Sequence, residues 1–229
     1  EHLMDYLIVV AGGKGERMGG NIPKQFQLLG GYPILMHTLN RLHEAAPEAV
    51  LILVLPALQQ SYWKELCYQH SFTLPYILAD GGPTRFHSVR NGLAAVPDDA
   101  QGVVGIHDVV RPFVATEVVR RCMSEAVEKG AVIPVLPVVD TIRQLSNGKS
   151  QTVRREEYCR VQTPQAFRIE IIKKAYLQEY TPTFTDDASV VEAENVQVSL
   201  VDGNPENIKI TTPFDKAVGE MLIQSGMNV

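Results

Sequence analysis

The sequence has no apolar run near the roughly 20 residues needed to cross a bilayer, so we expect no membrane-spanning helix. It also lacks a basic patch followed by an apolar stretch and a cleavage site, so we expect no secretory signal. Cysteine is scarce, and Cys67, Cys122 and Cys159 form neither a CxxC pair nor a Cys/His metal box. Scattered, unpaired thiols fit a reducing compartment better than a disulfide framework, so we expect a cytoplasmic protein.

Positive charge is also in short supply. The chain has 21 Lys and Arg against 26 Asp and Glu, which gives a formal net charge of −5. Proteins that bind nucleic acid through its phosphate backbone are more often basic, so we expect no nucleic-acid partner. An anionic small molecule would therefore have to meet a local cluster of cations. The 229 residues, 45% of them hydrophobic, have ordinary globular composition and can bury a core without disulfides.

Apolar runs alternate with helical patterns along most of the chain. The expected strands are 6–11, 50–55, 75–79, 103–107, 131–136, 196–201 and 208–210. The expected helices are 33–47, 61–70, 84–96, 116–129, 169–180, 186–194 and 213–224. This order predicts an α/β fold with a mostly parallel sheet that helices cover on both faces. Ligands bind beyond the carboxyl ends of such strands, so the loops after Ala11, Ala79 and His107 are candidate sites.

The alternation stops in the polar segment 137–160. Asn147-Gly148 lies there between two extended runs, which is a strong β-hairpin signal. A two-stranded ribbon has little to bury by itself, so it is either a solvated flap or an arm that packs on another subunit. We favour the arm and expect a homodimer formed through it. Because the chain has no repeats and no low-complexity linker, we expect a single domain over residues 1–229.

The glycine-rich loop after the first strand predicts a phosphate-binding turn. Residues 11–20 contain five glycines together with Lys14 and Arg17. Glycines let backbone N–H groups approach an anion, and arginine adds charge-assisted hydrogen bonds. The loop is not a Walker A motif, and Met18 stands where GxGxxG requires its third glycine. Lys24 follows closely and could contact the same anion. The alternatives are a flexible surface turn and an ordinary surface lysine.

Segment 80–93 contains the second candidate loop. Its Gly81-Gly82 pair turns the chain tightly, and Thr84 can cap the helix that follows. Arg85 and Ser88 fall in the first turns of that helix, where the backbone favours anions and polar groups. The alternative is a simple helix cap with solvated charges.

A carboxylate, Asp108, ends the fourth expected strand. It is well placed to hold Mg²⁺, which prefers one or two carboxylates together with phosphate oxygens. The alternative is an ordinary turn residue. We expect the adjacent His107 to be a half-buried strand histidine, because the sequence supplies no partner for nucleophilic catalysis.

Further polar candidates lie in the second half of the chain. Thr141 begins the hairpin, Arg155 ends it, and Thr185 precedes two acidic residues. Lys209 stands in a short apolar run, which is unusual unless the side chain reaches a charge. The alternative is an edge-strand lysine.

In their order, these loops resemble the 2-C-methyl-D-erythritol 4-phosphate cytidylyltransferases of the non-mevalonate isoprenoid pathway. The similar pieces are AGGKGERM at 11–18, PKQ at 23–25, DGGPTRFHSVRNGL at 80–93, HDVVRP at 107–112, DT at 140–141, TVRR at 152–155, QTPQAF at 162–167, TDDAS at 185–189 and NIKITTP at 207–213. Each piece is weak alone, but the ordered set is specific and covers nearly the whole chain. The resemblance implies a Rossmann-like nucleotidyltransferase fold, a homodimer with exchanged hairpin arms, and a requirement for CTP and Mg²⁺.

The resemblance also implies roles for individual residues. Arg17 and Lys24 would hold the triphosphate and stabilise the transition state. The residues that would hold CTP are Ala11, Gly12, Gly13, Gly15, Gly82, Ser88, Asp108 and Val109. Asp108 would also lie near the metal. The residues that would position the sugar phosphate are Thr141, Arg155, Thr185 and Lys209. Of these, Arg155 and Lys209 would also act in catalysis, with Arg155 coming from the partner subunit.

The implied reaction needs no general base. A phosphate monoester is mostly dianionic at pH 7 and can attack the α-phosphorus of CTP directly. The protein then has to neutralise, align and stabilise charge, which a set of cations can do. One alternative is a ribitol 5-phosphate or other polyol phosphate cytidylyltransferase, because those enzymes carry similar motifs. A more distant alternative is a non-catalytic nucleotide-binding module.

Overall fold

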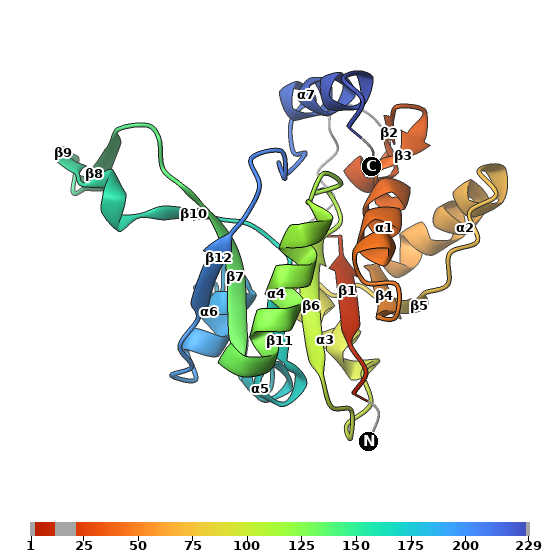
Figure 1. Ribbon diagram of the computed structural model, residues 1–229, viewed down its shortest axis with the longest axis horizontal. Coiled ribbons are helices and arrows are strands. Elements are labelled where there is room, and N and C mark those ends of the chain that lie inside the picture. Colours follow the sequence, from red (N-terminus) through yellow and green to blue (C-terminus); the bar gives the residue numbers. More distant parts are fainter. Residues whose placement is uncertain (1–2, 12–21, 228–229) are drawn as a thin grey trace.

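The computed structural model describes residues 3–11 and 22–227, and a single eight-stranded sheet forms its centre (Figure 1). The strand order is β10-β7-β11-β6-β1-β4-β5, and β12 also pairs with β7. The sheet strands are β1 (Tyr6–Val10), β4 (Val50–Leu55), β5 (Ile77–Asp80), β6 (Val103–Asp108), β7 (Ala131–Pro137), β10 (Cys159–Val161), β11 (Gln165–Arg168) and β12 (Ser199–Asp202). Only β10 and β11 run antiparallel to their neighbours in this sheet, so the prediction of a mostly parallel sheet is confirmed.

Helices cover both faces of the sheet, as the sequence predicts. The seven α-helices of the described residues are α1 (Ile34–Ala45), α2 (Gln60–Gln69), α3 (Arg85–Ala94), α4 (Thr116–Lys129), α5 (Ile169–Ala175), α6 (Asp187–Glu192) and α7 (Pro213–Gln224). Helices α1, α2 and α4 pack in one apolar cluster, and α3, α5 and α6 pack in a second cluster. In β1, Leu7 and Val9 belong to the first cluster, whereas Tyr6 and Ile8 belong to the second. Because strand side chains alternate between faces, the two clusters are the two cores on either side of the sheet. None of the helices in residues 3–11 and 22–227 is long and apolar enough to cross a membrane.

The expected hairpin projects from the body of the molecule as a two-stranded arm (Figure 1). Its strands, β8 (Ile142–Ser146) and β9 (Lys149–Val153), pair only with each other. Asn147 and Gly148 form the turn with φ of 48° and 72°, which is the positive-φ pair that a tight hairpin needs. A second small hairpin, β2 (Leu28–Leu29) with β3 (Tyr32–Pro33), precedes α1.

The structure differs from the sequence prediction at three places. Residues 208–210 do not form a strand. The backbone N–H of Ile210 donates to the carbonyl of Val110, but this single bond is not part of a strand pairing. The helix expected over 169–180 ends at Ala175, where the chain continues in tight turns. The sequence pattern does not predict the antiparallel strands β10 and β11, because three or four residues are too few to show an alternation of apolar and polar side chains.

Candidate active site

The strand ends singled out from the sequence meet at one edge of the sheet. Val10, at the end of β1, pairs with Asp108 at the end of β6, and β4 pairs in parallel with β5 as far as Asp80. The candidate residues Ala11, Gly82 and Asp108 therefore lie at or just beyond the ends of β1, β5 and β6, at the same edge of the sheet. Four other candidates, Gly12, Gly13, Gly15 and Arg17, lie outside the described residues.

The loop after β5 is held in one conformation by its own hydrogen bonds. The backbone N–H of Gly82 donates to Ser88 Oγ at 3.0 Å, so the two predicted CTP contacts are adjacent. Thr84 caps α3 by accepting from the backbone N–H of His87, as expected. A Cβ at position 82 would lie 2.4 Å from the Cβ of His87, so this turn requires glycine.

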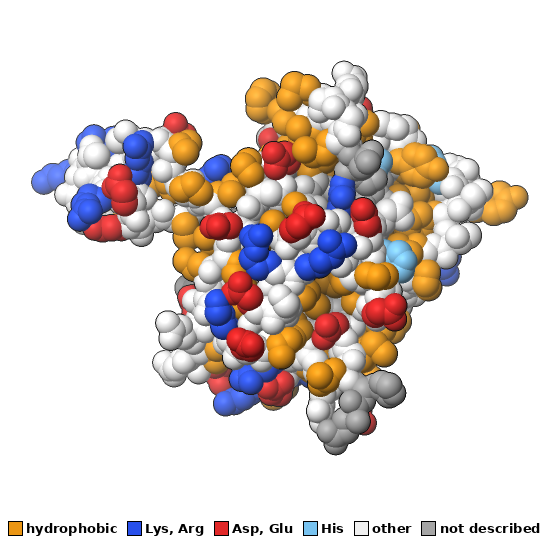
Figure 2. Space-filling view, in the orientation of Figure 1, with side chains coloured by type: hydrophobic (Ala, Val, Ile, Leu, Met, Phe, Trp, Pro, Cys, Tyr) orange, Lys and Arg blue, Asp and Glu red, His pale blue; other side chains and the backbone are white. Residues whose placement is uncertain are grey.

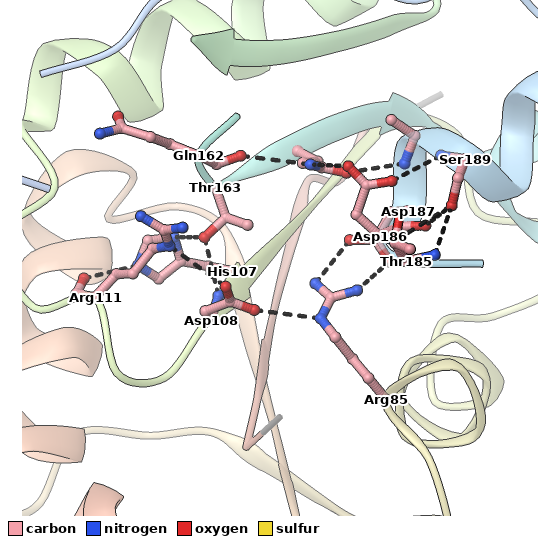
Figure 3. A network of polar contacts seen from close by, with 12 residues as sticks. Arg85, His107, Asp108, Arg111, Gln162, Thr163, Thr185, Asp186, Asp187 and Ser189 are labelled. Carbon is pink, nitrogen blue, oxygen red and sulfur yellow. Dashed lines mark hydrogen bonds and ion pairs between the residues drawn. The ribbon is translucent and has the colours of Figure 1, made fainter. Parts of the chain in front are cut away.

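Asp108 is surrounded by three cations from three parts of the chain, Arg85, Arg111 and Lys209. Figure 3 shows the first two of them beside the carboxylate. Its Oδ1 accepts from Arg85 Nε at 3.2 Å, and its Oδ2 lies 3.3 Å from both Arg111 Nε and Lys209 Nζ. Burial alone would raise the pKa of Asp108, but the three cations outweigh burial and hold that pKa well below its usual range. The carboxylate is therefore ionised, and it gathers positive charge at the edge of the sheet.

Arg85 has a second partner that the sequence did not indicate. Its NH1 and NH2 groups donate to the two carboxylate oxygens of Asp187 at 3.1 and 2.9 Å, and the Asp187 side chain is fully buried. Tyr176 Oη donates to Asp187 as well, at 2.6 Å. The sequence alternative was a helix cap with solvated charges. Thr84 does cap the helix, but the Arg85 charge is not solvated, because it pairs with Asp108 and Asp187.

His107 is fully buried rather than half-buried, which corrects the sequence prediction. Its pKa falls to about 4, chiefly because burial disfavours the charged ring. The neutral ring donates from Nε2 to the carbonyl of Arg111 at 2.9 Å, because a carbonyl can only accept. Nδ1 must then accept from Thr163 Oγ1 at 3.0 Å, and that oxygen accepts from the backbone N–H of Asp108 at 3.1 Å. These bonds fix the backbone on both sides of the carboxylate.

Lys209 reaches a charge, as its apolar surroundings predict, because Asp108 lies within ion-pair distance. Asn207, two positions before Lys209, is fully buried and anchors this segment. Its side-chain amide donates to Gln162 Oε1 and to the carbonyl of Thr163, at 3.2 and 2.8 Å. The Lys209 side chain remains 42% exposed, so its ammonium group can also contact a ligand.

Comparisons with known proteins identify the family of this chain. The family model for 2-C-methyl-D-erythritol 4-phosphate cytidylyltransferase matches residues 6–225. An enzyme of that name from Bacteroides thetaiotaomicron is 57% identical over 217 residues, which are 95% of this chain and 98% of the relative. One from Porphyromonas gingivalis is 46% identical over 96% of this chain and 98% of its own. The chain belongs to the 2-C-methyl-D-erythritol 4-phosphate cytidylyltransferase family.

Solved structures of this family have the same fold. The 4-diphosphocytidyl-2C-methyl-D-erythritol synthase of Anaerococcus prevotii superposes with a TM-score of 0.82 at 27% identity, covering 96% of each chain. The 2-C-methyl-D-erythritol 4-phosphate cytidylyltransferase of Thermus thermophilus gives 0.73 at 30% identity, over 95% of this chain and 98% of that one. The Rossmann-like nucleotidyltransferase fold is therefore confirmed, and this chain is an enzyme of the cytidylyltransferase class. Neither a ribitol phosphate enzyme nor a non-catalytic module is favoured.

In this cytidylyltransferase, Thr185 lies close to the charged network, whereas the two arm residues do not. Thr185 donates its backbone N–H to Ser189 Oγ at 3.1 Å, immediately before α6, and lies beside Asp187 in Figure 3. Thr141 and Arg155 belong to the projecting arm (Figure 1), where Arg155 bonds to the carbonyl of Val139. One chain alone therefore does not bring Thr141 and Arg155 to Asp108.

The valines after Asp108 face the core of the enzyme. The side chains of Val109 and Val110 are both buried. The backbone N–H of Val109 donates to the carbonyl of Val10, and its own carbonyl accepts from Thr38 Oγ1 at 2.6 Å. Both valine side chains therefore belong to the core rather than to the space beyond the strand ends.

The candidate carboxylate at this site, Asp108, can bind Mg²⁺ only together with phosphate oxygens of a substrate. Among the described ranges there is no group of three or more His, Cys, Asp or Glu that could hold a metal. Asp108 accepts hydrogen bonds from Arg85 and Arg111 and forms an ion pair with Lys209, which leaves about one of its roughly four acceptor positions. Mg²⁺ is commonly bound by one or two carboxylates plus substrate phosphates, and this single carboxylate fits that arrangement.

Proposed function

We propose that the protein transfers CMP from CTP to 2-C-methyl-D-erythritol 4-phosphate, giving 4-diphosphocytidyl-2-C-methyl-D-erythritol and pyrophosphate. The main support is the cation cluster of Arg85, Arg111 and Lys209 around buried Asp108, at the sheet edge where β1 and β6 end. Such a cluster suits two polyanionic substrates, whereas the molecule as a whole is acidic. Its three free cysteines support a reducing, cytoplasmic setting for this enzyme.

The reaction is an in-line displacement at the α-phosphorus of CTP. An oxygen of the methylerythritol phosphate forms a bond to the α-phosphorus, and the bond from that atom to the bridging oxygen of the pyrophosphate breaks. Arg17 and Lys24 bind the triphosphate and stabilise negative charge as pyrophosphate leaves. Lys209 and Arg155 hold the attacking phosphate in line. Asp108 would hold Mg²⁺ together with phosphate oxygens, and the bound ion would neutralise phosphate charge.

Pyrophosphate release tests the function directly. CTP should support release with 2-C-methyl-D-erythritol 4-phosphate, and ATP, GTP and UTP should support it far less. Ribitol 5-phosphate should be a poor substitute for the second substrate. Equal turnover with a purine triphosphate, or a preference for ribitol 5-phosphate, would contradict the proposal.

The arm supports a homodimer formed through residues 137–160. Its strands pair only with each other, yet Leu145 and Val139 are 80% and 67% exposed. An isolated ribbon is marginally stable in water, so these side chains gain most from packing on a second copy. Figure 2 shows Lys and Arg side chains gathered on the arm, where they could reach the partner's anionic substrates.

We therefore expect a dimer at micromolar protein concentration, measured by analytical ultracentrifugation. Leu145→Asp should shift the population towards monomer, because it places a charge in the proposed contact. Leu177→Asp is the matched control, since Leu177 is equally apolar and 85% exposed but lies outside the arm. A fully active monomer in the unmodified protein would refute this arrangement.

Arg155 and Lys209 should affect the sugar phosphate more than CTP. A charge-assisted hydrogen bond contributes about 1.5–3 kcal/mol, so removing either cation should raise the KM for the methylerythritol phosphate roughly ten-fold or more. CTP affinity, measured by calorimetry without the second substrate, should hardly change. Loss of CTP binding with an unchanged KM for the sugar phosphate would overturn this division of the site.

Mixing two inactive variants tests whether Arg155 acts across the dimer. Chains carrying Arg155→Ala and chains carrying Arg17→Ala should regain activity when they form mixed dimers. Each mixed dimer then contains one site in which both arginines are intact. If the mixture stays as inactive as its components, Arg155 acts within its own chain.

A further inference from the structure

We propose that Arg85 is a positioning residue that fixes the Asp108 carboxylate relative to α6, and thereby holds Lys209 in place for the transfer reaction. This inference rests on the proposed function and deepens it. The predicted site contains Asp108 and Lys209 as binding residues, but it assigns no role to Arg85.

The contacts of Arg85 are those of a buried connector rather than of a surface charge. It makes three hydrogen bonds, one to Asp108 and two to Asp187 (Figure 3). The exposed fractions of the three side chains are 19% for Arg85, 7% for Asp108 and 0% for Asp187. Desolvated, bidentate pairs of this kind hold a defined geometry, whereas exposed pairs contribute little.

The Asp187 end of the connection is firmly anchored. Asp187 is the first residue of α6, and Asp186 caps that helix in a reciprocal capping box with Ser189. Gln165 holds the same turn from β11: its Oε1 accepts from the backbone N–H of Ala188, and its Nε2 donates to Asp186 Oδ2, both at 2.9 Å. Together with the bond from Tyr176, these contacts keep Asp187 from following any movement of Arg85.

The other end of the connection determines how the Asp108 carboxylate is oriented. Arg85 occupies Oδ1, and this leaves Oδ2 facing Arg111 and Lys209. Without Arg85 the carboxylate is restrained only at Oδ2, where Arg111 donates, and it gains freedom to turn about its terminal bond. Lys209, whose side chain is 42% exposed, would then lose its fixed partner.

Arg85 also connects the two substrate halves of the site. It lies in the first turn of α3, and Ser88, one turn later, holds Gly82 of the nucleotide loop. Through Asp187 it contacts the helix that begins just after Thr185. The Arg85 side chain thus joins the end of β6 to the sugar-phosphate segment, and its helix holds the CTP loop through Ser88, so loss of Arg85 should misalign the reacting groups.

The test is Arg85→Lys, which keeps the charge but cannot make three bonds in a planar fork. We expect kcat to fall on the order of ten- to a hundred-fold and the KM for the methylerythritol phosphate to rise, with CTP affinity nearly unchanged. Tyr176→Phe should cause a smaller change of the same kind. Arg90→Lys, on the exposed side of the same helix, is the matched control. Circular dichroism at the assay temperature confirms that each variant is folded.

A double-mutant cycle with Lys209→Ala separates positioning from a merely structural role. If Arg85 acts through Asp108 on Lys209, then Arg85→Lys should cost much less in the Lys209→Ala background than in the unmodified enzyme. Additive losses, or a loss of CTP affinity alone, would overturn the inference.

Chemical labelling gives a readout that needs no substrate. Reductive methylation of Lys209, followed by mass spectrometry, should be several-fold faster in Arg85→Lys, because the ammonium group loses its fixed partner. Lys64, an exposed residue of α2, is the internal control. Equal Lys209 rates in both proteins would overturn the inference even if the enzyme transfers CMP. A faster rate in a protein without transferase activity would refute only the proposed function.

Discussion

Lys24→Ala is expected to lower kcat by a factor on the order of 10²–10³, the cost of losing one electrostatic stabiliser of a transition state. Lys24 opens a short 3₁₀ helix, Lys24–Phe26, directly after the glycine-rich segment. Its neighbours Gln25 and Phe26 are buried and anchor that helix. Gln25 also donates to Gln59 Oε1. Because these anchors remain, the variant should fold normally, and the loss should fall on catalysis alone.

Steady-state kinetics of pyrophosphate release measure this loss, and Lys64→Ala is the matched control. Lys64 is an exposed lysine of α2 outside the candidate site, so its removal should leave kcat unchanged. Arg17→Ala should resemble Lys24→Ala, because both cations are proposed to contact the triphosphate. A Lys24→Ala enzyme with nearly normal kcat would show that this lysine does not contact the transition state.

Features that depend on local sequence could be predicted before the structure was known. Helix α4 begins and ends where its apolar period and Gly130 indicate, and the arm turns at Asn147-Gly148. The strand ends that carry Gly82 and Asp108 come together because parallel strands end at one edge. Lys209 lies beside a carboxylate, as its apolar neighbours indicate.

Features that depend on tertiary packing could not be predicted. Arg85 and Asp187 are 102 positions apart, and no local pattern pairs two such residues. The full burial of His107 depends on Thr163, which is 56 positions away and covers the ring from another strand connection. An acidic pair before a short helix was the one available signal for Asp187, and a capping box explains that pattern equally well.

The buried ring of His107 leads to a pH dependence of folding stability in mildly acidic solution. The folded protein holds the pKa of His107 at about 4, whereas an unfolded chain has the ordinary value of 6.5. Between these values the unfolded state binds the proton and the folded state does not, so stability falls as the pH falls. The stabilisation is complete above about pH 6.5, and up to roughly 3 kcal/mol is lost as the pH approaches 4.

Urea unfolding at several pH values between about 4.5 and 7.5 measures this dependence. Asp108, whose pKa is also lowered, would contribute only near and below its ordinary value of 3.8, which lies below this range. His107→Gln should be less stable at pH 7.5 but should lose little further stability on acidification, because glutamine does not titrate. His43→Gln, at the end of α1, is the matched control and should keep the original slope. An unmodified protein whose unfolding free energy is flat from pH 7.5 to 4.5 would show that His107 is not held neutral. In that case Nδ1 would donate to Thr163 Oγ1 rather than accept from it.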